Sequence, residues 1–249
     1  MLDKRKFYIN GKWINSEVKK DLEVINPSNE DPYAIISLGT KEDVNLAVKV
    51  AKEAFDTWSK VTKREKITLL ENLLKIYNSR WDEITQTMSD EMGAPLDWSS
   101  TAQTASGADH IQDFILRLKN FEFENQFDEN SNNYIIYEPI GVCGLITPWN
   151  WPINQITLKV IPALAAGCTM ILKPSEIAPL SGMLFTEIIH EAGFPPGVFN
   201  LINGDGVGVG TDLASHEDID MISFTGSTRA GKLISKNAAD TIKRVCLEL

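Results

Sequence analysis

The chain has 249 residues, 43% of them hydrophobic, so it can form one large domain or two small ones around a packed core. This composition excludes a disordered chain, a collagen and a small scaffold held together by disulfides. Its 24 basic and 34 acidic residues give a net charge of −10, and we therefore expect no nucleic-acid partner.

The sequence pattern predicts neither a membrane span nor a secretory signal. The longest apolar run, from Val160 to Leu172, is shorter than the roughly 18–20 residues of a transmembrane helix, and Pro162 and Gly167 interrupt it. The first residues include basic ones, but no apolar segment follows them. Three widely spaced cysteines, Cys143, Cys168 and Cys246, are typical of reduced thiols. We expect a cytoplasmic protein without a membrane partner.

The first 120 residues are predicted to form a short β-hairpin followed by helices. Two strand-like pieces in Phe7–Trp13 flank Asn10-Gly11, which is a strong hairpin signal. Thr40 and Thr62 each begin a capping-box sequence, after which apolar residues recur at three- and four-residue steps. Aromatic residues at this spacing are interpreted as core. The expected helices cover about residues 41–58, 63–77, 81–93 and 97–118.

A polar, acidic segment from Phe121 to Asn133 separates the two halves of the chain. Phenylalanine and glutamate alternate at its start, a turn-rich tip follows, and Tyr134–Glu138 is the expected returning arm of a hairpin. Two interpretations are open at this point. The segment is either a solvated surface loop or a projecting ribbon whose unpaired edges recruit a partner subunit.

The second half alternates between strand-like and helix-like segments. Because parallel strands need long crossovers, this alternation predicts an α/β fold with a parallel sheet of about five strands and helices on both faces. The expected strands are Val142–Ile146, Thr169–Lys173, Val198–Ile202, Met221–Phe224 and Val245–Leu249. The expected helices are Ile153–Ala166, Leu180–Ala192 and Ala230–Ala238.

Ligands of such sheets bind beyond the carboxyl ends of the strands, and unusual residues follow four of the expected strands. These clusters are Thr147–Pro152, Lys173–Glu176, Asn203–Gly208 and Thr225–Thr228. The Trp149-Asn150-Trp151 segment is predicted to be part of a functional site, because packing alone does not explain a rigid amide between two tryptophans.

The other clusters have two interpretations each. The Gly226–Gly231 turn suits a pyrophosphate at a helix N-terminus, although Thr228 replaces the middle glycine of the strict dinucleotide motif and tight turns use glycine anyway. Lys173 and Glu176 suit the two hydroxyls of a ribose, or they are solvated surface charges.

Glu248 is a carboxylate inside an apolar strand. Alternation places it on one face with Cys246, which fits the wet face of an edge strand as well as it fits a catalytic base with a raised pKa. Buried, unreactive thiols are expected for all three cysteines. The three histidines lie far apart without the spacing of metal ligands, so no metal site is expected.

In their order and spacing, these motifs resemble the NAD(P)-dependent aldehyde dehydrogenase superfamily, and the resemblance covers the whole chain. The motifs that carry it are Ile9–Trp13, Ile146–Pro152, Lys173–Glu176, Glu191–Gly197, Phe224–Thr228 and Leu247–Leu249. The resemblance implies a discontinuous, Rossmann-like NAD-binding domain of residues 1–120 and 140–249, with N-terminal helices. It also implies an oligomerisation hairpin at residues 121–139 that builds a homodimer or homotetramer.

Site roles follow from the same resemblance. Asn150 matches the amide that holds the oxyanion formed when a cysteine attacks a small aldehyde, and Glu248 matches the base that activates water for thioester hydrolysis. Glu176 favours NAD over NADP because a carboxylate repels a 2′-phosphate. The implied cofactor-binding residues are Ile146, Thr147, Pro148, Trp149, Lys173, Ser175, Glu176, Gly204, Gly208, Phe224, Thr225, Gly226, Ser227, Thr228 and Gly231.

No cysteine of this chain matches the family's nucleophile, which follows the motif containing Glu248 by about thirty residues in relatives. The expectation is therefore that the catalytic domain is absent from these residues and that the chain alone is inactive. One alternative is a catalytically inactive NAD-binding fragment or structural subunit. Another is an aldehyde dehydrogenase that acylates coenzyme A, which Glu248 disfavours because a hydrolytic base would waste the thioester.

Overall fold

The computed structural model describes residues 1–129 and 132–249 and is built around a central sheet. Within these residues the sheet has seven strands in the order β12-β11-β8-β9-β10-β2-β3. The parallel strands are β8 (Val142–Ile146), β9 (Thr169–Lys173), β10 (Phe199–Leu201), β11 (Met221–Thr225) and β12 (Arg244–Glu248). They confirm the five strands expected from the sequence, and every strand end agrees within one residue.

The N-terminal hairpin extends this sheet. Strand β2 (Phe7–Ile9) pairs antiparallel with β10 and with β3 (Lys12–Ile14), and the turn between them has positive φ at Asn10 (52°) and Gly11 (75°). The sequence predicted the hairpin but not its place beside β10. A separate sheet of β1 (Leu2–Asp3), β5 (Pro32–Ser37) and β4 (Asp21–Ile25) was not expected.

The helices begin close to their expected residues. Both capping boxes form, with Thr40 and Thr62 accepting hydrogen bonds from the backbone N–H groups of Asp43 and Glu65. The expected helix 97–118 contains a π-helical segment that the sequence did not predict. The helical segments are α1 (Lys41–Trp58), α2 (Lys63–Ser79), α3 (Trp81–Met92), α4 (Leu96–Trp98), η1 (Ser99–Thr104), α5 (Ala105–Asn120), α6 (Pro152–Ala166), α7 (Leu180–Ala192), η2 (Gly206–Gly210), α8 (Thr211–Ser215) and α9 (Thr228–Ala239).

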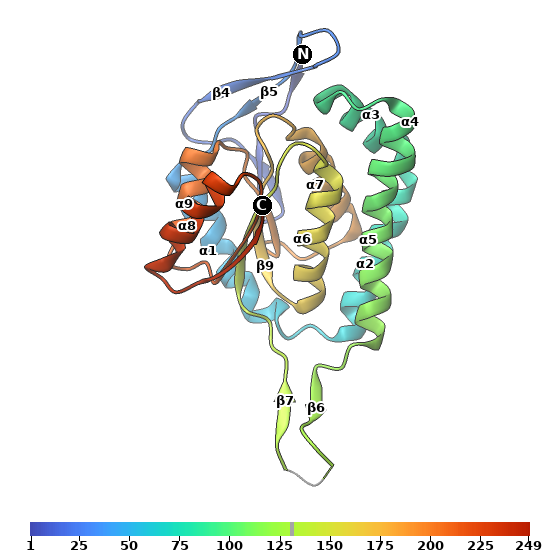
Figure 1. Ribbon diagram of the computed structural model, residues 1–249, viewed down its shortest axis with the longest axis vertical. Helices are drawn as coiled ribbons and strands as arrows, with labels where there is room; N and C mark the ends of the chain where they lie inside the picture. The colour runs from blue at the N-terminus through green and yellow to red at the C-terminus, as the bar shows by residue number, and fades with distance from the viewer. Residues whose placement is uncertain (130–131) are drawn as a thin grey trace.

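Helices cover both faces of the sheet (Figure 1). Helices α6 and α7 lie on one face, with α2 and α5 packed outside them, and α1, α8 and α9 lie on the other. Trp58 and Tyr77 are buried, so these two aromatic residues of the helical stripes are indeed core. In the described ranges, none of the helices combines the length and the apolar character needed to cross a membrane.

A two-stranded ribbon projects from the body at the end opposite β4 and β5 (Figure 1). It consists of β6 (Glu124–Gln126) paired antiparallel with β7 (Tyr134–Ile136), and all three β7 side chains are exposed. Part of the expected hairpin tip, residues 130–131, lies outside the described residues. The observed geometry fits a projecting ribbon better than a loop lying on the surface.

Candidate active site

The segment after β8 presents an amide and two indole rings at the carboxyl end of the sheet. Strand β8 is buried throughout, whereas Trp149 is half exposed and Asn150 is exposed directly before α6 begins at Pro152. The side chain of Asn150 has no hydrogen-bond partner in residues 1–129 and 132–249, so both of its N–H donors are available. The Trp151 ring meets that of Trp98 edge to face, with ring centroids 6.0 Å apart.

Glu248 lies on the edge strand of the sheet, and both of its carboxylate oxygens face partners. Its Oε2 accepts a hydrogen bond of 2.9 Å from the Thr225 hydroxyl on the neighbouring strand. Its Oε1 lies 3.7 Å from Nζ of Lys159 on α6. The interpretation that Glu248 lies on the solvent-facing side of an edge strand is correct, since its side chain is exposed. The Thr225 hydroxyl and the Lys159 ammonium nevertheless orient its carboxylate.

Lys159 is a site residue that the sequence analysis missed. Its side chain is only 2% exposed, and its Nζ donates to the Ser223 hydroxyl at 3.1 Å. Burial lowers the pKa of Lys159, and the nearby Glu248 carboxylate opposes that shift. The available signal was that Lys159 is the single charged residue of the expected helix Ile153–Ala166, because a lysine that is buried in a helix needs a specific partner.

Lys173 and Glu176 form an ion pair at the end of β9. Nζ of Lys173 donates to the carbonyl of Gly204 (2.6 Å), to the carbonyl of Pro174 (2.9 Å) and to Oε2 of Glu176 (3.3 Å). These acceptors use the three donors of the ammonium, and burial lowers the pKa of Lys173. Lys173 therefore ties β9 to the loop after β10 and holds Glu176, whose side chain is 34% exposed.

The glycine-rich turns have packing reasons of their own. A Cβ on Gly204 would lie 2.3 Å from the Val209 side chain, and one on Gly226 would lie 2.5 Å from the Phe224 ring. In the first turn, Oδ1 of Asp205 accepts the Gly208 N–H at 2.6 Å. In the second, the Ser227 hydroxyl caps α9, whose N-terminus lies at the carboxyl end of β11. A helix N-terminus there is a suitable place for an anion.

The strand order brings these segments to one edge of the sheet. After β8 the chain passes outward through β9 and β10 and then returns to β11 on the other side of β8, which creates the switch point where such folds bind ligands. Ile146 of β8 is aligned with Lys173 of β9 and with Phe224 of β11. The buried Thr147 hydroxyl at this edge has no hydrogen-bond partner among the residues that the structure describes. This edge therefore offers groups that suit a dinucleotide, namely the unpaired Thr147 hydroxyl, the Glu176 carboxylate and the N-terminus of α9.

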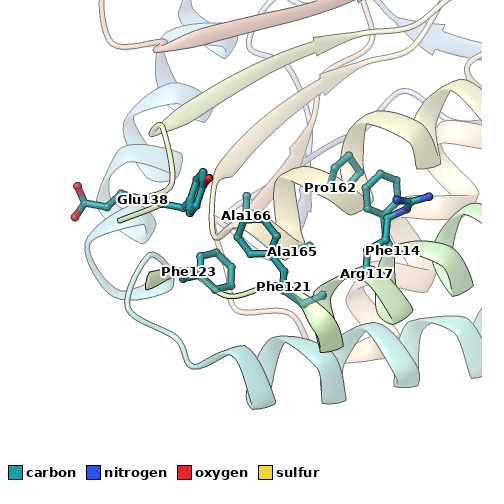
Figure 2. Close-up of a pocket in the computed structure, with 10 residues that line it drawn as sticks. Phe114, Arg117, Phe121, Phe123, Glu138, Pro162, Ala165 and Ala166 are labelled. Carbon is teal, nitrogen blue, oxygen red and sulfur yellow. The ribbon is translucent and has the colours of Figure 1, made fainter. Parts of the chain in front are cut away.

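An apolar cavity of about 370 Å³ lies elsewhere, at the base of the projecting ribbon (Figure 2). Aromatic side chains from α5 and from both arms of the ribbon surround it, together with Pro162, Ala165 and Ala166 of α6. The ribbon leads into the amino end of β8, so this cavity is at the wrong end of the sheet to be part of the site.

Comparison with known proteins identifies the family. The model of the aldehyde dehydrogenase family matches residues 13–249. The chain belongs to the aldehyde dehydrogenase family. A 3-succinoylsemialdehyde-pyridine dehydrogenase of a Pseudomonas species is 52% identical over 250 residues, covering 100% of this chain and 52% of the relative. A putative aldehyde dehydrogenase of Staphylococcus aureus is 42% identical, again over 100% of this chain and 52% of its own length.

Solved structures of the family have the same fold. An aldehyde dehydrogenase from Bartonella henselae is 58% identical with a TM-score of 0.99, covering 100% of this chain and 52% of its own. A mutant aldehyde dehydrogenase C from Pseudomonas syringae, solved with NAD+ and octanal, is 44% identical with a TM-score of 0.96, covering 98% and 50%. This chain thus spans about half the length of its aldehyde dehydrogenase relatives.

Proposed function

We propose that the protein carrying this chain oxidises an aldehyde to a carboxylic acid with NAD, and that this chain is its cofactor-binding part. The observation that carries the proposal is the orientation of Glu248 by Thr225 and Lys159 at the edge of the sheet that fits a dinucleotide. The match to the family model and the relatives solved with NAD+ support it.

The residues at the carboxyl edge would hold the cofactor, which accepts a hydride from the substrate carbon when bound. The N-terminus of α9, with Ser227 and Thr228, would receive the pyrophosphate. Glu176 would accept hydrogen bonds from the hydroxyls of the adenosine ribose. Lys173 would keep the Glu176 carboxylate in place through the hydrogen bond between them. The same carboxylate would repel a 2′-phosphate, and we therefore assign NAD rather than NADP.

Asn150 and Glu248 would carry out the steps assigned to this chain. The free amide of Asn150 would donate to the oxyanion formed when a cysteine thiolate adds to the aldehyde, and such a donor is worth about 3–4 kcal/mol in the transition state. Hydride loss from that adduct leaves a thioester. Glu248 would then remove a proton from the water that hydrolyses the thioester.

The nucleophile is not assigned to any cysteine of this chain. Cys143 and Cys168 are buried in the protein core. Cys246 does not match the family's nucleophile position. The expectation of three buried thiols was wrong for Cys246, which is exposed on the edge strand because β12 has no outer neighbour within the described residues. We expect no aldehyde oxidation by these 249 residues alone.

The projecting ribbon would join subunits into a homodimer or homotetramer. Its exposed Tyr134, Ile135 and Ile136 form an apolar edge, and an unpaired edge of this kind pairs readily with another strand. Light scattering of the complete protein tests this assignment, and a monomer at micromolar concentration would contradict it.

The activity is tested by substitutions in the complete protein. Glu248→Gln should leave a single burst of NADH while steady turnover falls by about 10²–10⁴-fold, because only hydrolysis needs the base. Asn150→Ala should slow the burst itself by about 10²–10³-fold. The exposed Glu217→Gln is the matched control and should change neither phase.

The outcomes separate the proposal from its alternatives. An unchanged steady rate in Glu248→Gln would remove Glu248 from the mechanism. Turnover of the unmodified protein that requires coenzyme A would identify the acylating type of dehydrogenase. Binding of NAD without NADH formation from a panel of short aldehydes would identify a protein that binds the cofactor but has no catalytic function.

A further inference from the structure

The N-terminus of helix α7 is capped by a carboxylate from a distant part of the chain. Glu91, in the last turn of α3, is 1% exposed, and its oxygens accept hydrogen bonds from the backbone N–H groups of Leu180 (2.5 Å) and Ser181 (2.9 Å). The Ser181 hydroxyl donates to the same carboxylate. Pro179, directly before the helix, supplies no side-chain cap. Glu91 therefore takes the place of a local capping residue and puts a carboxylate at the positive end of α7.

The capped helix end is joined directly to the segment that carries the proposed ribose contact. Strand β9 ends at Lys173 and α7 begins at Leu180, so residues 174–179 connect the two elements. Glu176 lies within this connection, where the Lys173 ammonium donates a hydrogen bond to it. The other end of the connection enters α7 at the two residues that Glu91 holds. The position of Glu176 thus depends on a contact at each end of a short segment.

The first turn of α7 also contacts the surroundings of Lys173. A Cβ on Gly182 would lie 3.1 Å from the Pro174 side chain, so the helix packs closely against the residue that follows β9. Nδ2 of Asn203 donates to Sδ of Met183 at 3.4 Å. Asn203 lies in the loop after β10, and the next carbonyl of that loop accepts a hydrogen bond from Lys173. A displacement of this helical turn would therefore move both segments that hold the ion pair of Lys173.

We propose that Glu91 is a positioning residue for the adenosine-ribose side of the cofactor site. Because it is buried, Glu91 would not touch the cofactor, and it acts through the start of α7, which it holds where Glu176 can reach the ribose hydroxyls. The inference rests on the proposed function, since it takes Glu176 to be the residue that contacts the ribose of NAD. It adds a residue of α3 to those that determine the affinity for NAD.

Glu91→Gln tests this role at nearly constant side-chain volume. One carboxylate oxygen becomes an NH2 group, which cannot accept, so at least one donor at the start of α7 loses its acceptor. Burial raises the pKa of Glu91 to about 7, and NAD binding is therefore measured at pH 8, where the unsubstituted protein carries the ionised form. In calorimetric titrations of the complete protein without aldehyde, we expect the Kd for NAD to rise about tenfold.

Steady-state kinetics distinguish positioning from a general loss of structure. In Glu91→Gln the KM for NAD should rise, whereas the KM for the aldehyde and kcat at saturating NAD should stay unchanged. Tyr77→Phe is the matched control. Tyr77 is fully buried and its hydroxyl donates to the Thr104 carbonyl at 2.8 Å, so this variant also loses one buried hydrogen bond, but between α2 and η1. It should leave the Kd for NAD unchanged, and an equal rise in Tyr77→Phe would overturn the proposal.

A double-mutant cycle tests whether Glu91 acts through Glu176. Glu176→Gln weakens the ribose contact itself. If Glu91 positions that contact, Glu91→Gln combined with Glu176→Gln should raise the Kd for NAD by less than the product of the two single effects, because the second substitution removes what the first one displaces. A combined effect equal to that product would show that the two residues act independently, and it would overturn the proposal.

The remaining outcomes separate this inference from the proposed function. If the unsubstituted protein binds NAD and Glu91→Gln binds it equally well, Glu91 has no positioning role and the proposed function stands. If the unsubstituted protein does not bind NAD, both are overturned. If Glu91→Gln does not fold, Ser181→Ala removes only the hydroxyl donor and leaves both backbone N–H groups on Glu91. We expect a rise of about threefold in the Kd for that variant, and an unchanged Kd would overturn the proposal.

Discussion

Nζ of Lys159 lies 3.7 Å from Oε1 of Glu248, which joins a buried cation on α6 to a half-exposed carboxylate on the edge strand. Because water reaches Glu248, the pair contributes little to stability. The effect of the ion pair is instead to orient the Glu248 carboxylate. Lys159 and Thr225 each hold one oxygen, so the carboxylate cannot rotate freely at the edge of the sheet.

Lys159→Met should therefore slow thioester hydrolysis while the NADH burst stays unchanged. We expect a fall of about tenfold in steady turnover, smaller than the 10²–10⁴-fold contribution of the base itself. Since burial lowers the pKa of Lys159, the unsubstituted protein should lose this ion pair as the pH rises into the range where Lys159 deprotonates. A pH profile of steady turnover should show that alkaline limb, and its persistence in Lys159→Met would assign the limb to another group.

Glu176→Gln should shift the cofactor preference toward NADP. The substitution keeps an acceptor for the ribose hydroxyls but removes the charge that repels a 2′-phosphate, so we expect the ratio of kcat/KM for NADP over NAD to rise by about tenfold, equivalent to roughly 1.4 kcal/mol. Steady-state kinetics with both cofactors measure this ratio. Glu217→Gln removes an equal charge from the surface, and an equal shift in that variant would mean that only net charge matters.

Glu91 makes stability depend on pH. This carboxylate is 1% exposed and accepts hydrogen bonds from the backbone N–H groups of Leu180 (2.5 Å) and Ser181 (2.9 Å) at the start of α7. Burial raises the pKa of Glu91 to about 7. Between its unfolded pKa near 4.5 and about 7, the folded state retains the proton that the unfolded state releases, so stability falls as the pH rises.

The shift corresponds to about 3 kcal/mol between pH 4 and pH 8. Glu91→Gln cannot titrate, and it should be less stable at low pH, where it loses one acceptor, while its stability changes less with pH. Urea unfolding of the complete protein, followed by tryptophan fluorescence at several pH values, measures both slopes. Parallel slopes would show that Glu91 does not carry this dependence.

Ile242→Gly should stabilise the protein. Ile242 has φ of 57° in the turn between α9 and β12, and it is 92% exposed, so it is strained without burying its side chain. A left-handed conformation costs a β-branched residue roughly 1–2 kcal/mol, and the flexibility of glycine in the unfolded chain offsets part of the gain. We expect a net gain of about 1 kcal/mol in the free energy of unfolding. Ile242→Val keeps the branch and should show no gain.

The sequence alone determined most of the elements and the family. Strands β8 and β9 were predicted to the residue, because buried parallel strands are continuous apolar runs between turn residues. Thr40 and Thr62 marked helix starts because capping is a local interaction within four residues. The order of motifs around Asn150, Lys173 and Glu248 likewise required no structure, since each residue lies at the end of its strand or a few residues beyond it in the chain.

Only the tertiary structure decided which groups meet. The contact between Lys159 and Glu248 and the hydrogen bond from Lys173 to the Gly204 carbonyl both join segments that are separate in sequence. Composition and periodicity report the environment of a residue along its own element. Strand order and helix packing set the distances between elements, and those distances decide which buried charges have partners.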